Sequence, residues 1–152
     1  METHSPEHVL EHEAPKPFLV HIAPHMMPQA WPVIEPLLAK ACDESRGEFT
    51  LRSIVENLEH WPILAIVRGA DVQAVMVTCI SIRADGARRV LDCLLASGDH
   101  ASDWPLVDDE FDDFARGFGC VAVRIPRARK GWLKALPHWK LTGQFVTLER
   151  EI

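Results

Sequence analysis

Three β-rich runs joined by short turns constrain the fold of this chain more than any other sequence feature. The runs are rich in Val, Ile and Leu and cover residues 63–67, 72–82 and 88–95. The turns between them, 68–71 and 84–86, each combine glycine with aspartate, a composition typical of tight connections between antiparallel strands. The sequence therefore predicts an antiparallel three-stranded meander in the middle of the chain.

Segments with helical periodicity precede and follow this meander. Apolar residues share one stripe between 29 and 41, and Thr50 is a good N-cap for a short helix ending near residue 59. The strongest pattern comes after the meander, with spacings of three and four between Trp104, Val107, Phe111, Phe114 and Phe118. A short helix at 131–136, stopped by Pro137, is the last one predicted.

The remaining segments complete a single domain. Residues 18–22 can form a first strand, 120–125 is a continuous apolar run typical of a buried central strand, and 139–149 alternates like a last strand. A length of 152 residues and a hydrophobic content of 47% suit one core. Residues 1–17 have too little apolar content to pack alone. We therefore expect an acidic N-terminal arm over 1–17 and one domain over 18–152.

Charge is distributed unevenly along the chain. The net charge of −6 disfavours nucleic-acid binding. The stretch 103–118 carries six carboxylates, mostly on the solvent face of the Trp104 helix, and a basic cluster follows between 124 and 134. A solvated helix face explains the carboxylates, and docking of a protein partner or a second copy is the functional alternative. The candidate interaction residues are Asp108, Asp109, Asp112, Arg127, Arg129 and Lys130.

Cysteine usage and hydropathy restrict the compartment. The four cysteines are far apart and form no CxxC pair, so we expect reduced, buried thiols and a cytoplasmic protein. No apolar run reaches the roughly 18 to 20 residues that a bilayer span needs, so no membrane association is expected. His4, His8 and His12 have the spacing of a helical metal site, but Pro6 interrupts such a helix, and no metal is expected.

The order of elements and the C-terminal residues point to a known family. The order is strand, two helices, three meandering strands, helix, strand, helix, strand. The C-terminal residues are Arg129-Lys130-Gly131-Trp132, Trp139-Lys140, Thr142-Gly143 and Val146-Thr147-Leu148-Glu149. Together they resemble the GNAT superfamily of acyl-CoA N-acyltransferase-like proteins, and in particular short GNAT-like proteins encoded by tailed phages. The resemblance implies an α/β fold with a mixed, mostly antiparallel sheet flanked by helices on both faces, whose strands splay where acetyl-CoA enters.

Two departures from the family pattern bear on function. GNAT enzymes hold the CoA pyrophosphate with an Arg/Gln-x-x-Gly-x-Gly/Ala loop after the fourth strand, whereas residues 95–102 here contain one glycine and place Asp99 near the phosphates. Many GNAT enzymes also protonate the leaving thiolate with a tyrosine. This chain contains no tyrosine, so Cys120, His138 or a water molecule would have to substitute.

Two hypotheses about function follow from the resemblance and its departures. The first is a degenerate GNAT-like phage protein without a cofactor, acting through protein interaction as a virion or assembly component, in the host cytoplasm or the virion. The second is an acetyl-CoA-dependent N-acetyltransferase of unknown amine specificity, with Leu95, Ser97 and Gly98 as cofactor-binding residues. No catalytic residue is assigned. Glu56, Glu59 and His60 are available as a general base. A solvated helix face also explains why these polar residues occur there.

Overall fold

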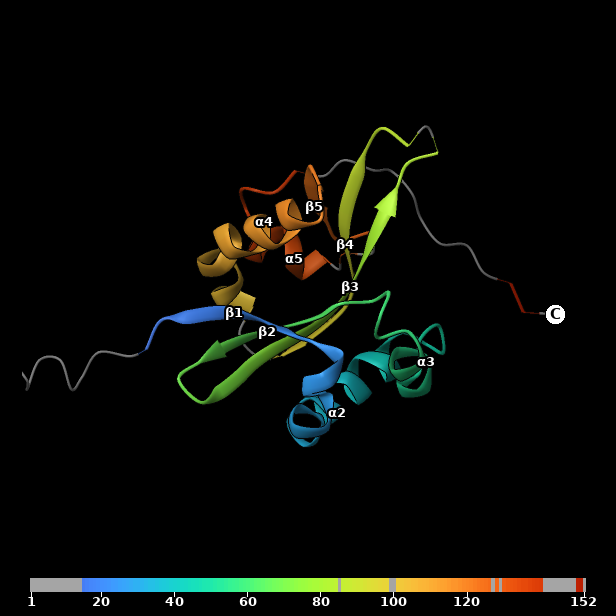
Figure 1. The fold of residues 1–152 in the computed structure, drawn as a ribbon, viewed down its shortest axis with the longest axis vertical. Coiled ribbons are helices and arrows are strands. Elements are labelled where there is room, and N and C mark those ends of the chain that lie inside the picture. The colour runs from blue at the N-terminus through green and yellow to red at the C-terminus, as the bar shows by residue number, and fades with distance from the viewer. Residues whose placement is uncertain are drawn as a thin grey trace, which may run out of the picture.

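Five strands form one sheet in the computed structural model of the chain (Figure 1). The structure describes residues 15–84, 86–98, 101–126, 128, 130–140 and 150–151. In spatial order the strands are β1 (Pro17–Ile22), β2 (Ile63–Arg68), β3 (Asp71–Ile82), β4 (Arg89–Gly98) and β5 (Ala122–Arg124). β1 to β4 pair antiparallel, and β5 runs parallel to β4. The predicted meander and mixed sheet are therefore confirmed, whereas most of the predicted arm and of the strand at 139–149 lies outside the described residues.

Helices cover both faces of the sheet, as the resemblance implies (Figure 1). The helices on the first face are α2 (Met27–Glu44) and α3 (Leu51–Glu56), and η1 (Pro24–Met26) leads into α2. Those on the second face are η2 (Ala101–Val107), α4 (Asp108–Gly117) and α5 (Lys130–Ala135). β2 lies between the two layers: Ile63 and Ala65 pack in the first core, and Leu64 and Ile66 in the second. This two-sided burial explains why β2 reads as a continuous apolar run.

α2 forms despite two internal prolines. It begins at Met27, two residues before the predicted start. Pro28 lies in its first turn, where backbone N–H groups have no intrahelical acceptor, so its missing N–H removes no hydrogen bond. Pro32 and Pro36 lie inside the helix. The apolar stripe that includes Ile34 and Leu38 is buried against the sheet. Tertiary packing of this stripe therefore compensates for the loss of the backbone hydrogen bonds that the internal prolines cannot make.

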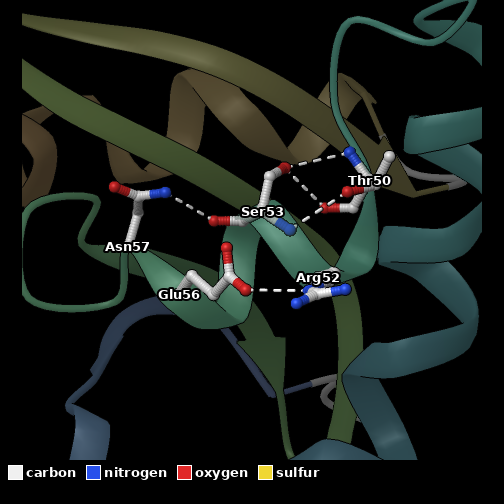
Figure 2. Close-up of polar contacts among 5 residues, drawn as sticks. All are labelled: Thr50, Arg52, Ser53, Glu56 and Asn57. Carbon is white, nitrogen blue, oxygen red and sulfur yellow. Dashed lines mark hydrogen bonds and ion pairs between the residues drawn. The ribbon is translucent and has the colours of Figure 1, made fainter.

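α3 begins at the predicted N-cap, as Figure 2 shows. The Thr50 side chain accepts a hydrogen bond from the backbone N–H of Ser53 at 3.0 Å, and the backbone N–H of Thr50 donates to the Ser53 hydroxyl at 3.0 Å. The helix ends at Glu56, three residues earlier than expected. Asn57 leaves the helical conformation, and its carbonyl accepts from the N–H groups of His60 and Trp61 in a tight turn.

The Trp104 segment and the strand after it differ in detail from the prediction. The segment starts as the 3-10 helix η2, which contains Pro105, and becomes α-helical at Asp108. β5 is only three residues long and pairs with β4, and it has no second neighbour among the described residues, so its predicted central position stays a prediction. Val121 is 70% exposed, whereas Cys120 and Val123 pack toward α4. Only part of the apolar run is therefore buried.

Candidate active site

β4 and β5 part after three paired residues. The pairs are Val90 with Ala122, Leu91 with Val123, and Asp92 with Arg124. β5 ends at Arg124, but β4 continues along β3 to Gly98. Among the described residues, the edge of β4 that faces away from β3 consequently has no partner strand from 93 to 98. A free strand edge offers backbone N–H and C=O groups to a ligand.

A β-bulge lies on β4 just past this divergence. Val77 of β3 is opposite Leu95, whereas the next residue, Thr78, is opposite Cys93. Leu94 is therefore an extra residue without a partner on β3. Bulges interrupt the regular ladder and re-aim side chains, and they are over-represented beside active sites. The free edge thus begins with a local break in the hydrogen-bonding pattern of the strand.

A polar cluster marks the last pair before the divergence. Arg124 Nε donates to Asp92 Oδ1 at 2.7 Å, and Arg124 Nη2 donates to Asp92 Oδ2 at 2.9 Å. The Ser81 hydroxyl also donates to Asp92 Oδ2. Asp92 is 4% exposed, whereas the Arg124 side chain is 44% exposed. The hydrogen bonds with Asp92 raise the pKa of Arg124, which stays charged.

The cluster lies on the α2 side of the sheet. Leu91 and Cys93 pack toward α4, so Asp92 points to the opposite face by strand alternation. Ile80 packs in the core beneath α4, so its neighbours Cys79 and Ser81 point to the same face of the sheet as Asp92. Burial raises the pKa of the Cys79 thiol, which is therefore a neutral, weakly polar neighbour of the ion pair.

The three predicted cofactor-binding residues all lie in β4. Leu95 packs against the α2 core, and the buried Ser97 has a hydroxyl without a hydrogen-bond partner among the described residues. β4 extends past the predicted end of its run at residue 95, because Ser97 pairs with Val75 and Gly98 pairs with Ala74. Gly98 packs tightly there: an added Cβ would lie 2.3 Å from the carbonyl oxygen of Gln73.

The face of the sheet behind the divergence is filled with aromatic side chains. Trp104 stacks on Phe111 with ring centroids 4.8 Å apart, and Trp132 meets Trp104 edge to face at 4.8 Å. Cys93 and Ile125 belong to the same cluster. Burial raises the pKa of the Cys93 thiol to about 12. Ligand access along β4 on this side is therefore closed by packing.

The helix that follows β4 carries a buried carboxylate in its first turn. Asp103 is 7% exposed, and its Oδ1 accepts from Arg68 Nη2 at 2.9 Å. The second oxygen of Asp103 has no hydrogen-bond partner among the described residues. Helix N-termini attract anions, but here the position already holds a negative charge. Asp99, the carboxylate predicted to lie near the phosphates, is outside the described residues, and the described first turn with Asp103 does not fit a pyrophosphate held in the usual GNAT manner.

The other predicted residues are spread over the molecule. Asp109 and Asp112 are exposed on α4, and Asp108 contacts the His138 ring. Arg127 and Arg129 lie outside the described residues, and Lys130 begins α5. Cys120 is buried beside Ala115, and burial raises the pKa of its thiol. The candidate general bases Glu56, Glu59 and His60 are all exposed. Glu56 also forms an ion pair with Arg52.

Asp92 was not predicted as a site residue, and Arg124 was predicted only as part of the basic cluster between 124 and 134. The available signal was a carboxylate inside the apolar run 90–95, since a buried aspartate requires a partner. The partner lies 32 residues further along the chain and could not be named from spacing. No group of three or more metal-ligating side chains occurs among the residues that the structure describes.

Several solved structures similar to this chain are acetyltransferases. A ribosomal-protein-alanine N-acetyltransferase from Brucella melitensis biovar Abortus 2308 matches with a TM-score of 0.65 and 10% identity, over 90% of this chain and 99% of that chain. An aminoglycoside N-acetyltransferase in complex with CoA matches with a TM-score of 0.60 and 6% identity, over 92% and 97%. A GNAT family acetyltransferase from Staphylococcus aureus gives 0.56 and 9%, over 89% and 99%. No protein-family model matches the sequence, and no curated protein sequence matches it either.

These similarities show that the chain has the fold of GNAT acetyltransferases. The expected fold class is confirmed, whereas the resemblance to phage proteins stays a prediction. In the described part of the chain, no helix is both long and apolar enough to cross a membrane.

Proposed function

We propose that the protein is an N-acyltransferase that moves an acyl group from a thioester donor to an amine where β4 and β5 diverge. The observation that carries this proposal is the edge of β4 from 93 to 98, which has no partner strand among the described residues and contains the Leu94 bulge. Acetyl-CoA is the expected donor, because one of the similar acetyltransferases is in complex with CoA. The donor's amide-containing arm would hydrogen-bond to this edge as an added strand does.

Ser97 gives separate support for a ligand on β4. Buried hydroxyl groups normally have a hydrogen-bond partner, and one without a partner costs about 1–3 kcal/mol. The Ser97 hydroxyl is buried and has no such partner among the described residues. A donor lying along the strand would supply one. Ser97 and Leu95 share a face of β4, so both remain candidate cofactor-binding residues, next to Gly98.

The proposed reaction is direct attack of the amine on the thioester carbon. The C–N bond forms as the C–S bond breaks, the amine gives its proton to water, and the departing thiolate takes a proton from water. The protein would contribute by holding the two reactants together and by donating backbone N–H groups to the carbonyl oxygen. Asp92 is engaged with Arg124 and Ser81, so it positions Arg124 rather than serving as a free base.

The pyrophosphate of CoA would contribute less affinity than in enzymes with the usual loop. Asp103 places a buried carboxylate in the first turn after β4, and its partner Arg68 is already engaged. The pantetheine arm is then the main determinant of donor affinity. Acetyl-pantetheine, which lacks the nucleotide, should accordingly bind nearly as well as acetyl-CoA.

Calorimetric titration with acetyl-CoA, together with thiol release in the presence of a panel of amines, tests the proposal. Wild-type protein should bind acetyl-CoA, and Ser97→Ala should weaken binding by about fivefold to tenfold, as expected for one lost hydrogen bond. Ser53→Ala is the matched control: it removes a hydroxyl from the α3 cap and should lower stability without changing donor affinity. Absence of binding at millimolar acetyl-CoA would rule the proposal out.

A protein-interaction role, including one in a virion or its assembly, is the second candidate function. It is favoured by exposed Asp109 and Asp112 on the acidic face of α4, which a basic partner surface or a basic region of a second copy would complement. Sedimentation at low and high salt tests self-association. A monomer under both conditions would exclude salt-dependent self-association.

A further inference from the structure

The guanidinium of Arg124 has one hydrogen-bonding edge engaged and a second edge open. A guanidinium carries five N–H donors, so it can hold one carboxylate through Nε and one terminal nitrogen and another through both terminal nitrogens. Asp92 occupies the first edge, at 2.7 and 2.9 Å. The second edge, formed by Nη1 and the remaining hydrogen of Nη2, has no partner among the described residues.

The open edge is held in a fixed orientation. Asp92 is 4% exposed, and the Ser81 hydroxyl donates to the same carboxylate, so its position is fixed within the sheet. The Arg124 side chain is 44% exposed and extends from this anchor toward solvent. A guanidinium already oriented by a buried carboxylate loses less conformational entropy on binding a ligand than a free arginine does.

The open edge also lies at the proposed site of acyl transfer. Arg124 is the last residue of β5 and is opposite Asp92, two residues before the bulge at Leu94. We propose that this edge of Arg124 binds a carboxylate of the acyl acceptor, so that the acceptor is an amino acid whose amino group reaches the donor thioester. This inference rests on the proposed function, because it names the substrate class for the same site.

A pair of small ligands tests the inference without requiring turnover. N-acetylglycine and N-acetylglycinamide both resemble the reaction product, and they differ only in carrying a carboxylate or an amide. Calorimetric titration of the full chain should show N-acetylglycine binding at least about tenfold more tightly, as expected for a charged bidentate contact. Arg124→Gln should abolish this preference. Arg116→Gln, which changes an exposed arginine on α4, should retain it.

A folding defect in Arg124→Gln would be detected by thermal unfolding, and Arg124→Lys then provides the second test. Lysine keeps the positive charge but cannot hold two carboxylates through two edges, so the preference should again fall severalfold. Equal binding of the two ligands by the wild type, binding of neither, or an unchanged preference in both folded Arg124 variants would overturn the inference. Thiol release from acetyl-CoA with amines lacking a carboxylate, together with equal ligand binding, would uphold the proposed function and reject only the inference.

Discussion

Asp92 and Arg124 form a two-point ion pair at the last residues that join β4 to β5. The distances are 2.7 and 2.9 Å, and only the carboxylate is fully buried. The pair therefore marks the end of the parallel pairing. Beyond it, this edge of β4 has no partner strand among the described residues. The unequal burial of the pair has consequences for stability as well as for ligand binding.

Loss of Arg124 should destabilise the fold more than loss of Asp92. Arg124→Ala leaves a buried carboxylate without its cation, at a cost of about 2–3 kcal/mol, whereas Asp92→Ala leaves a guanidinium that solvent can reach. Urea unfolding of both single variants and of the double variant measures the difference. A larger loss in Asp92→Ala than in Arg124→Ala would contradict this assignment of the buried partner.

The α3 cap should contribute more to stability than the ion pair beside it (Figure 2). Thr50→Ala removes the side chain that accepts from Ser53 N–H and should lower the free energy of unfolding by about 1 kcal/mol. Arg52→Ala breaks an exposed i,i+4 pair with Glu56 and should cost less than about 0.5 kcal/mol. Chemical denaturation of the two variants provides the comparison, and equal losses would argue against the cap.

Two glycines should respond to alanine in opposite ways. At Gly98 the new Cβ would lie 2.3 Å from Gln73 O and 2.7 Å from Ala74 Cα, so β3 and β4 must separate, at a cost of about 2 kcal/mol or more. Gly117, at the end of α4, has open space around it. Gly117→Ala should be neutral or stabilising by up to about 1 kcal/mol. Melting temperatures of the two variants decide this, and tolerance of Gly98→Ala would contradict the close approach of the strands.

His21 should make the protein less stable in mild acid. Its ring meets Phe114 edge to face at 5.1 Å, and this partial burial of an otherwise exposed residue lowers its pKa below the ordinary value of 6.5. The unfolded chain therefore binds a proton more readily than the folded chain does, so this contribution to stability is present above 6.5 and is lost as the pH falls below it. The free energy of unfolding at about pH 7 and pH 5.5 should differ less in His21→Gln than in the wild type. An identical difference in both proteins would show that His21 does not cause the loss of stability in mild acid.

The meander and the Trp104 helix could be predicted because their signals are local. Gly69 has a φ of 62° in a tight turn, and Trp104, Val107 and Phe111 of η2 and α4 face one core. The end of β4 could not be predicted in this way. Ser97 and Gly98 have the composition of a turn, but pairing with Val75 and Ala74 holds them in the strand, and such pairing is a tertiary effect.

The candidate site was harder to predict than the fold for the same reason. The divergence of two strands follows from where their pairing ends, and neither the position of Arg124 opposite Asp92 nor the extra residue Leu94 has a local sequence signal. Asp92, a charged residue inside an apolar run, was the one indication that the sequence offered.

Hydrogen exchange with and without acetyl-CoA tests the central claim most directly, because it locates the donor as well as detecting it. If the donor lies along the free edge of β4, saturating acetyl-CoA should slow amide exchange in residues 93–98 and leave α3 unchanged. No slowing at 93–98, or slowing confined to the acidic face of α4, would contradict an acyltransferase site where β4 and β5 part.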